Sequence, residues 1–382
     1  MEILADAHIP FVEQAFSSLG HVTALPAGAI RPPLPGHTEV LLVRSVTRVD
    51  AHLLRGSRVR FVATATSGCD HVDVAYLRQA GIGFAHAPGC NANAVAEYVL
   101  SALLALVEQG RLAWPSVRVG IIGCGHVGSN LLRKLQTLGV RCLVNDPPLQ
   151  ASTGDPRFVD LKELFPCDVL TLHVPLVRGG RYPTFHLVDE SFLARMKSGA
   201  VLVNTARGSV VDERALLAAL TQGRLAAVVD VWPDEPEIDF GLVEHVALAT
   251  PHIAGHSFEG KVRGTEMIYR AACRFFQAEP LWKVDSVLAS APRISLTFGA
   301  DESDEAVLRR SVFAAYDVRR DDAALRELAR APEDRRAAAF VALREGYPDR
   351  PEFSRVEIHL PPGRKALRNR LQALGFVVRE RS

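Results

Sequence analysis

Short apolar runs alternate with helical patterns along the first 255 residues of the chain. The runs EILADA, VLLVRS, RFVATAT and GIGFAHA precede residue 90, and DVLTLHVP, AVLVNTARG, AAVVDVW and VALATPH follow residue 165. Brief apolar runs separated by amphipathic helices are typical of buried parallel strands. The pattern therefore predicts an α/β protein, whose ligands are expected at the carboxyl ends of the strands.

One stretch, Arg118–Asp146, reads as a strand, a glycine turn, a helix and a second strand. Gly123, Gly125 and Gly128 form GxGxxG directly after an apolar run. In this motif the first glycine allows the tight turn, the second lets the backbone approach a pyrophosphate, and the third brings the helix close to the strand. Asp146 ends the second strand, where a carboxylate accepts hydrogen bonds from ribose hydroxyls and repels a 2′-phosphate. The stretch predicts a dinucleotide site that prefers NAD to NADP.

The same patterns divide the chain into three regions. Residues 1–92 and 256–285 are expected to form a split substrate domain, and residues 93–255 a doubly wound nucleotide-binding domain that begins with a long, buried helix rich in Ala and Leu. The segment from Pro280 to Pro292 reads as a linker. Residues 290–382 should form a C-terminal α+β module with the order strand, several helices, strand, helix, strand.

Composition narrows the choice of partners and compartment. The 382 residues are 48% hydrophobic, which is enough for two or three cores. Because 44 basic and 43 acidic residues nearly cancel, nucleic acid and anionic membranes are not expected as partners. The start of the sequence resembles no signal peptide and no apolar run could cross a bilayer, so we expect a cytoplasmic protein. Its six cysteines form no CxxC pair, which favours free thiols over disulfides or a metal site.

Three side chains at separate strand ends suit hydride transfer at a carbinol carbon. Arg207 could hold an α-carboxylate through a two-pronged hydrogen bond, and His252 could take the hydroxyl proton as hydride leaves. Glu235 could orient the imidazole and favour its protonated form. Each residue also has an ordinary reading: an ion pair for Arg207, a surface acid in a Pro-rich turn for Glu235, and a polar strand end for His252. Taken together, in one expected crevice, the three support a dehydrogenase.

The segments NTARGSVVDERALLAAL, VVDVWPDEP and TPHIAGHSFEG resemble the signatures of the D-isomer-specific 2-hydroxyacid dehydrogenases. The resemblance implies a flavodoxin-like substrate domain beside the NAD-binding domain, and it implies that Arg207, Glu235 and His252 are the catalytic trio. It further implies cofactor contacts at Gly123, Gly125, His126, Val127, Gly128, Asp146, Val174, Thr205, Ala206, Arg207, Asp230 and Gly255, and substrate contacts at Ser45, Thr66 and His256. His256 stands where Tyr is usual, and Val174 where Thr is common.

Other segments, LLVRSVTRVD, FVATATSGCDHVD, APGCNANAVAEYV and HIAGHSFEGKVRGT, are similar to one branch of this family. That branch oxidises 4-phospho-D-erythronate to 2-oxo-3-hydroxy-4-phosphobutanoate with NAD, in the biosynthesis of pyridoxal 5′-phosphate (vitamin B6). One alternative is another D-2-hydroxyacid dehydrogenase, such as one acting on 3-phosphoglycerate, and another is a non-enzymatic NAD-sensing corepressor. The branch also carries an extra C-terminal module, which implies a homodimer; the alternative is a module folded against its own chain.

Overall fold

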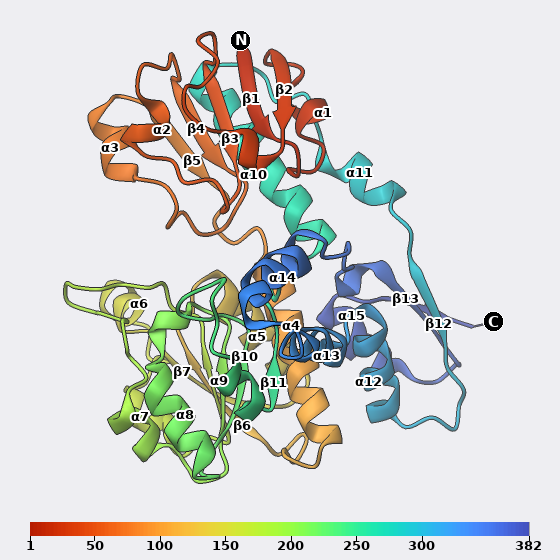
Figure 1. Cartoon of the computed structure of the whole chain (residues 1–382). Coiled ribbons are helices and arrows are strands. Elements are labelled where there is room, and N and C mark those ends of the chain that lie inside the picture. Colours follow the sequence, from red (N-terminus) through yellow and green to blue (C-terminus); the bar gives the residue numbers. More distant parts are fainter. Residues whose placement is uncertain (382) are drawn as a thin grey trace. The chain divides into compact units, whose positions relative to one another are not determined.

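The computed structural model describes residues 1–381 and divides into two compact units (Figure 1). Unit 1 comprises Met1–Asn91 and Ser257–Pro292. Unit 2 comprises Ala92–His256 and the chain from Arg293 onward. Each unit has its own hydrophobic clusters and its own sheets.

Unit 1 contains one five-stranded parallel sheet, in the order β2-β1-β3-β4-β5. Its strands are β1 (Glu2–Asp6), β2 (His21–Leu25), β3 (Val40–Val43), β4 (Phe61–Thr64) and β5 (Gly83–His86). Both β3 and β4 are buried along their whole length, which explains why they read as continuous apolar runs. This order is the flavodoxin-like one, as predicted.

Helices cover both faces of this sheet, as the two apolar clusters of the unit indicate. They are α1 (Val12–Phe16), α2 (Ala51–Leu54), α3 (Val74–Gln79), α10 (Phe258–Phe276) and α11 (Val284–Ser290), with a 3-10 turn at Ala27–Ala29. Ser257 caps the start of helix α10, and its hydroxyl accepts a hydrogen bond from the Gly260 N–H at 2.9 Å. Its buried residues Ile268, Tyr269 and Ala272 join the cluster of β1, β3 and β4. The late helix therefore completes the first domain, as the sequence predicted.

The larger sheet of unit 2 is six-stranded and parallel, in the order β11-β10-β9-β8-β6-β7. Its strands are β6 (Arg118–Ile122), β7 (Arg141–Asn145), β8 (Val169–Leu172), β9 (Val201–Asn204), β10 (Ala226–Val229) and β11 (Leu248–Ala249). The strand order reverses between β6 and β8, which is the topological switch point where α/β sheets bind ligands. The glycine motif follows β6 and therefore lies at this point.

All helices of this doubly wound region except the first start at an aspartate or glycine cap. They are α4 (Ala92–Glu108), α5 (His126–Thr137), α6 (Pro147–Thr153), α7 (Glu190–Arg195), α8 (Glu213–Thr221) and α9 (Phe240–His245), with 3-10 turns at Leu161–Leu164 and Gly208–Val210. Aspartate side chains accept the first backbone N–H groups of α6, α7, α8 and α9. Helix α4 is buried over most of its length, as its Ala- and Leu-rich sequence predicted. Within residues 1–381, no helix is long and apolar enough to cross a bilayer.

The C-terminal module has the predicted order of strand, helices, strand, helix, strand. It consists of β12 (Ile294–Thr297), α12 (Asp304–Ala315), α13 (Val318–Leu328), α14 (Glu333–Glu345), a 3-10 turn at Phe353–Arg355, β13 (Val356–Leu360), α15 (Lys365–Leu374) and β14 (Val377–Glu380). Its three strands pair in parallel. Crossover helices therefore connect them, as in α/β proteins.

This module packs on the nucleotide-binding region of the same chain. Leu308, Val312 and Tyr316 of the module are buried in the cluster that contains α4, and Phe340 is buried with α8 and α9. These apolar residues of the module are thus used inside one chain. The Ser101 hydroxyl of α4 also donates a hydrogen bond to the Tyr316 carbonyl at 2.9 Å.

Candidate active site

Asp230, which follows β10, organises the loop after β11. Its Oδ1 accepts hydrogen bonds from the Thr250 hydroxyl at 2.7 Å and the Ile253 N–H at 2.8 Å, and the Ala254 N–H donates to both carboxylate oxygens at 3.1 Å. Burial raises the pKa of Asp230, while His252 and these hydrogen bonds act in the opposite direction. Asp230 is only 1% exposed, so it serves as a buried anchor for residues 250–254.

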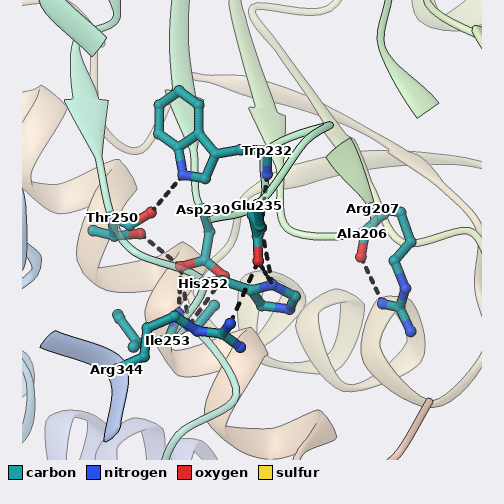
Figure 2. Close-up of polar contacts among 10 residues, drawn as sticks. Ala206, Arg207, Asp230, Trp232, Glu235, Thr250, His252, Ile253 and Arg344 are labelled. Carbon is teal, nitrogen blue, oxygen red and sulfur yellow. Dashed lines mark hydrogen bonds and ion pairs between the residues drawn. The ribbon is translucent and has the colours of Figure 1, made fainter. Parts of the chain in front are cut away.

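His252 and Glu235 form a close pair on this loop (Figure 2). The Glu235 carboxylate lies 2.8 Å (Oε2) and 3.0 Å (Oε1) from Nδ1 of His252. The Trp232 N–H donates to Oε1 at 2.9 Å, which fixes the orientation of the carboxylate. With Nδ1–H donated to Glu235, the other ring nitrogen, Nε2, keeps its lone pair for a proton from a ligand. His252 has a left-handed φ of 57°, a conformation that the bonds to Asp230 hold in place.

Glu235 remains a carboxylate in spite of its burial. Burial raises its pKa, but His252, the Trp232 N–H and the Arg344 guanidinium together hold the pKa of Glu235 below its usual range. Nη1 of Arg344, in α14, is 3.6 Å from Oε2 of Glu235. A negative charge beside the ring favours a protonated imidazole, so the pair can both accept and release a proton.

Arg207 lies on the neighbouring strand-end loop, after β9 (Figure 2). The Asn204 side chain shapes this loop, because its Oδ1 accepts the Ala206 N–H and its Nδ2 donates to the Arg207 carbonyl, both at 3.1 Å. A Cβ atom at Gly208 would lie 2.0 Å from the Trp232 carbonyl carbon, so only glycine allows the two loops to approach this closely. The loops after β9, β10 and β11 thus bring Arg207, Glu235 and His252 to one edge of the sheet.

The glycine motif fits a dinucleotide. Gly123 has a φ of 90°, and a Cβ there would lie 2.7 Å from the His173 carbonyl oxygen. A Cβ at Gly128 would lie 2.0 Å from the Gly123 carbonyl oxygen, whereas a Cβ at Gly125 would meet no atom within 4 Å. The first and third glycines therefore serve close packing, and the second leaves its side of the loop open. No side chain caps α5, so its first N–H groups can receive phosphate oxygens.

Asp146 has a second role besides its charge. Its Oδ2 accepts the Cys124 N–H at 2.8 Å and its Oδ1 accepts the Leu149 N–H at 3.0 Å, so it ties the glycine loop to the start of α6. Each carboxylate oxygen retains a further lone pair that can accept a ribose hydroxyl.

The other expected cofactor residues surround these loops. Val174 and Thr205 adjoin His173, whose Nδ1 is 3.3 Å from the Thr205 hydroxyl and whose Nε2 is 3.0 Å from the Thr171 hydroxyl. Burial lowers the pKa of His173 to about 3, so this ring is neutral at working pH. Of the remaining expected positions, His126 and Val127 begin α5, Ala206 precedes Arg207, and Gly255 and His256 follow the loop that Asp230 holds.

The expected substrate residues of unit 1 follow β3 and β4, which are neighbouring strands. Ser45 is exposed, and the Thr66 hydroxyl lies 2.7 Å from the Thr64 hydroxyl and donates to the Gly68 carbonyl at 2.8 Å. Asp6, at the end of β1, was not identified from the sequence. Its fully buried carboxylate accepts the Arg44 Nε–H at 2.9 Å and so holds the guanidinium at the same sheet edge.

Comparison with known proteins places the chain in a family. Residues 110–254 match the model of the D-isomer specific 2-hydroxyacid dehydrogenase, NAD binding domain. A protein from Marinobacter nauticus named erythronate-4-phosphate dehydrogenase is 45% identical over 98% of this chain and 99% of its own length. The chain belongs to the D-isomer-specific 2-hydroxyacid dehydrogenase family. It is an NAD-dependent oxidoreductase, and NAD is its cofactor, as the sequence predicted.

Two further comparisons extend the family assignment. An erythronate-4-phosphate dehydrogenase from Salmonella paratyphi B is 44% identical over 94% of both chains. The NAD-bound 3-phosphoglycerate dehydrogenase of Entamoeba histolytica has a TM-score of 0.61 over 72% of this chain and 95% of its own, at 22% identity, which shows a common fold. Residues 288–375 match a family described only as a domain of unknown function.

Sequence reasoning missed Arg344 and His173. His173 ends a predicted strand, and that position was the available signal. Arg344 lies in a helix with two other arginines, and nothing in its sequence context distinguishes it.

Proposed function

We propose that this enzyme oxidises 4-phospho-D-erythronate to 2-oxo-3-hydroxy-4-phosphobutanoate, with NAD, in pyridoxal 5′-phosphate biosynthesis. The relatives named erythronate-4-phosphate dehydrogenase, which match almost the full length of the chain, support this substrate. The observation that carries the chemistry is the 2.8 Å contact between Glu235 and Nδ1 of His252, because it leaves Nε2 available as a base.

His252 is the general base for the 2-hydroxyl group of the substrate. Glu235 holds the ring and stabilises the imidazolium that forms when the proton arrives. Arg207 binds the carboxylate next to the reacting carbon through its planar guanidinium. NAD, when bound, accepts the hydride that leaves this carbon. The glycine motif and Asp146 hold the cofactor, with Val174, Thr205, Asp230 and Gly255 around it, and His256 contacts the substrate from the end of the Asp230-held loop.

The phosphorylated end of the substrate binds the loops of unit 1 around Arg44, Ser45 and Thr66. A dianion needs several donors, and this sheet edge offers a guanidinium, hydroxyl groups and backbone N–H groups. The ion pair between Arg44 and Asp6 supports this role, since it orients the guanidinium before the ligand arrives.

A fluorescence assay of NADH formation with a panel of hydroxyacids tests the proposed function. The panel contains 4-phospho-D-erythronate, unphosphorylated D-erythronate, 3-phospho-D-glycerate and D-lactate. We expect the highest kcat/KM with 4-phospho-D-erythronate and a large loss with D-erythronate. A higher kcat/KM with 3-phosphoglycerate would assign the chain to that alternative, and absence of turnover with every member would contradict the proposal.

We propose further that the protein is a homodimer assembled through the C-terminal module. Strands β12 and β14 are the outer strands of their sheet, and an outer strand has backbone groups available for pairing with a second copy. Because the module packs on the nucleotide-binding region of its own chain, removing it would expose apolar surface, so the full-length chain is the right sample. Sedimentation equilibrium should give twice the chain mass of 41.6 kDa, and a single-chain mass would refute the dimer.

A cytoplasmic location is also proposed. The six cysteines are all free, which is the ordinary state of thiols in a reducing compartment. Fractionation of the producing cell, with detection by an antibody against the chain, tests this location.

A further inference from the structure

A short segment of the C-terminal module, residues 344–350, contacts the proposed catalytic loops at three points. Arg344, in the last turn of α14, approaches Glu235, with 3.6 Å between Nη1 and Oε2 (Figure 2). The Tyr347 ring meets the His256 ring edge to face, with 5.7 Å between the centroids. Arg350 donates to the Ala254 carbonyl at 2.8 Å. The module therefore takes part in the geometry of the loop that carries His252.

Buried polar contacts hold this segment firmly. Arg350 is 5% exposed, also donates to the Ala94 carbonyl at 3.0 Å, and stacks over the Tyr316 ring at 4.1 Å. The hydroxyls of Tyr316 and Tyr347 both donate to Oδ2 of Asp321 at 2.8 Å. Because Tyr347 and Arg350 are fixed, the backbone of this segment holds Arg344 near Glu235, in addition to the attraction between their charges.

Arg344 is a second partner of the Glu235 carboxylate, which also contacts His252. Oε2 of Glu235 lies 2.8 Å from His252 Nδ1 and 3.6 Å from Arg344 Nη1, so the ring and the guanidinium share one oxygen. The Arg344 Nε–H is buried and has no hydrogen-bond partner among residues 1–381, so the ion pair is the polar contact that this side chain makes at the site. A positive charge here weakens the pull of Glu235 on the imidazolium.

The other charged groups around the pair come from separate elements. Asp230, after β10, interacts electrostatically with His252, and Tyr347, after α14, interacts with Asp230. Both of these groups are anionic or neutral. The module brings two cations to this loop, Arg350 at the Ala254 carbonyl and Arg344, and of the two Arg344 is the one that forms an ion pair with Glu235.

We propose that Arg344 is a positioning residue for the Glu235–His252 pair, through which the C-terminal module sets the pH at which His252 works as a base. The proposal rests on the proposed function for its kinetic test alone. Without Arg344, Glu235 should hold the imidazolium more strongly, so His252 should release its proton at a higher pH.

An NMR titration of the histidine rings decides the proposal without any substrate. The protein is labelled with ¹³C at histidine Cε1, and the His252 signal is assigned from its loss in His252→Asn. The midpoint should rise in Arg344→Gln, which removes the charge and keeps a polar side chain, and should stay near the parent value in Arg344→Lys. Arg335→Gln, at an exposed position of the same helix, is the matched control and should leave the midpoint unchanged.

The pH dependence of kcat/KM for hydroxyacid oxidation provides the second reading. For Arg344→Gln the acidic limb should move up with the NMR midpoint, so that kcat/KM falls by about three- to tenfold on that limb and recovers at higher pH. Arg344→Met repeats the test if the glutamine variant does not fold. An unmoved midpoint in a folded, uncharged variant would overturn the proposal, as would an equal loss of rate at every pH. A moved midpoint without turnover of any hydroxyacid would uphold Arg344 and refute the substrate.

Discussion

Replacing Glu235 by glutamine removes the charge beside His252 and keeps the size and shape of the side chain. Because the Trp232 N–H donates to Oε1 at 2.9 Å, the amide oxygen of glutamine should occupy that position. Its NH₂ group then takes the position of Oε2, which is 2.8 Å from Nδ1 of His252. An NH₂ group there can only donate, so it favours the tautomer with the ring proton on Nε2, which can no longer act as a base.

The size of the effect follows from these contacts. If His252 kept its proton on Nδ1, the Nδ1–H and the NH₂ group of the glutamine would face each other as two donors. This costs roughly 1–3 kcal/mol and lowers kcat by about five- to 150-fold. The lost charge has a separate effect on pH dependence. A carboxylate in contact with a histidine favours the protonated ring, so without the charge of Glu235 the acidic limb should move to lower pH.

Initial rates of NADH formation between pH 6 and pH 10 give both quantities. Glu237→Gln, at an exposed position two residues away, is the control and should match the parent enzyme. His252→Ala should lose about a hundredfold or more in kcat at every pH. If Glu235→Gln kept the parent kcat and the parent acidic limb, the role given to this pair would be wrong.

Three further predictions concern the cofactor, the fold and the substrate. Asp146→Ser keeps a cap for α6 but removes the negative charge, so the ratio of kcat/KM for NAD to that for NADP should fall by about tenfold or more; an unchanged ratio would remove the role of the carboxylate in selectivity. Lys134→Met removes the ammonium group that lies 3.3 Å from the buried Glu97 carboxylate. In urea denaturation the free energy of unfolding should fall by roughly 3–5 kcal/mol. The control Arg133→Met, at an exposed position, should lower it by less than about 0.5 kcal/mol. Burial raises the folded-state pKa of Glu97, so below this pKa Glu97 is protonated and needs no cation. The stability lost in Lys134→Met should therefore be larger at pH 8 than at pH 5. An equal loss of stability at both pH values would contradict this. Ser45→Ala should weaken binding of 4-phospho-D-erythronate by about fivefold and leave NAD binding unchanged in calorimetry, whereas equal losses for both ligands would indicate a folding defect.

Local patterns were sufficient for the nucleotide-binding region. The turn at Gly123, the close approach at Gly128 and the cap at Asp146 depend on neighbours within one βαβ unit, so their sequence context carries the information. The same holds for the strand ends, because parallel strands direct their carboxyl ends to one edge. Arg207 and His252 could therefore be chosen before any geometry was known.

Contacts across distant segments could not be read in this way. Lys134 looks like a solvated helix residue, yet it is buried and donates to the Leu374 carbonyl of the C-terminal module at 2.6 Å. Arg344 looks like one of several surface arginines, and only the packing of α14 within unit 2 brings it to Glu235. Leu308 and Phe340 of the module pack on the nucleotide-binding region of the same chain. The sequence of a segment does not show which apolar surface that segment packs against.

A deuterium label follows the hydride directly from the substrate to the cofactor. The enzyme is incubated with NAD and 4-phospho-D-erythronate that carries deuterium at the carbon bearing the 2-hydroxyl group, and the reduced cofactor is examined by mass spectrometry. The parent enzyme should form NADH that is heavier by one mass unit, and His252→Ala should form it about a hundredfold or more slowly. Reduced cofactor without deuterium, or equal rates for the parent and the variant, would contradict hydride transfer with His252 as the base.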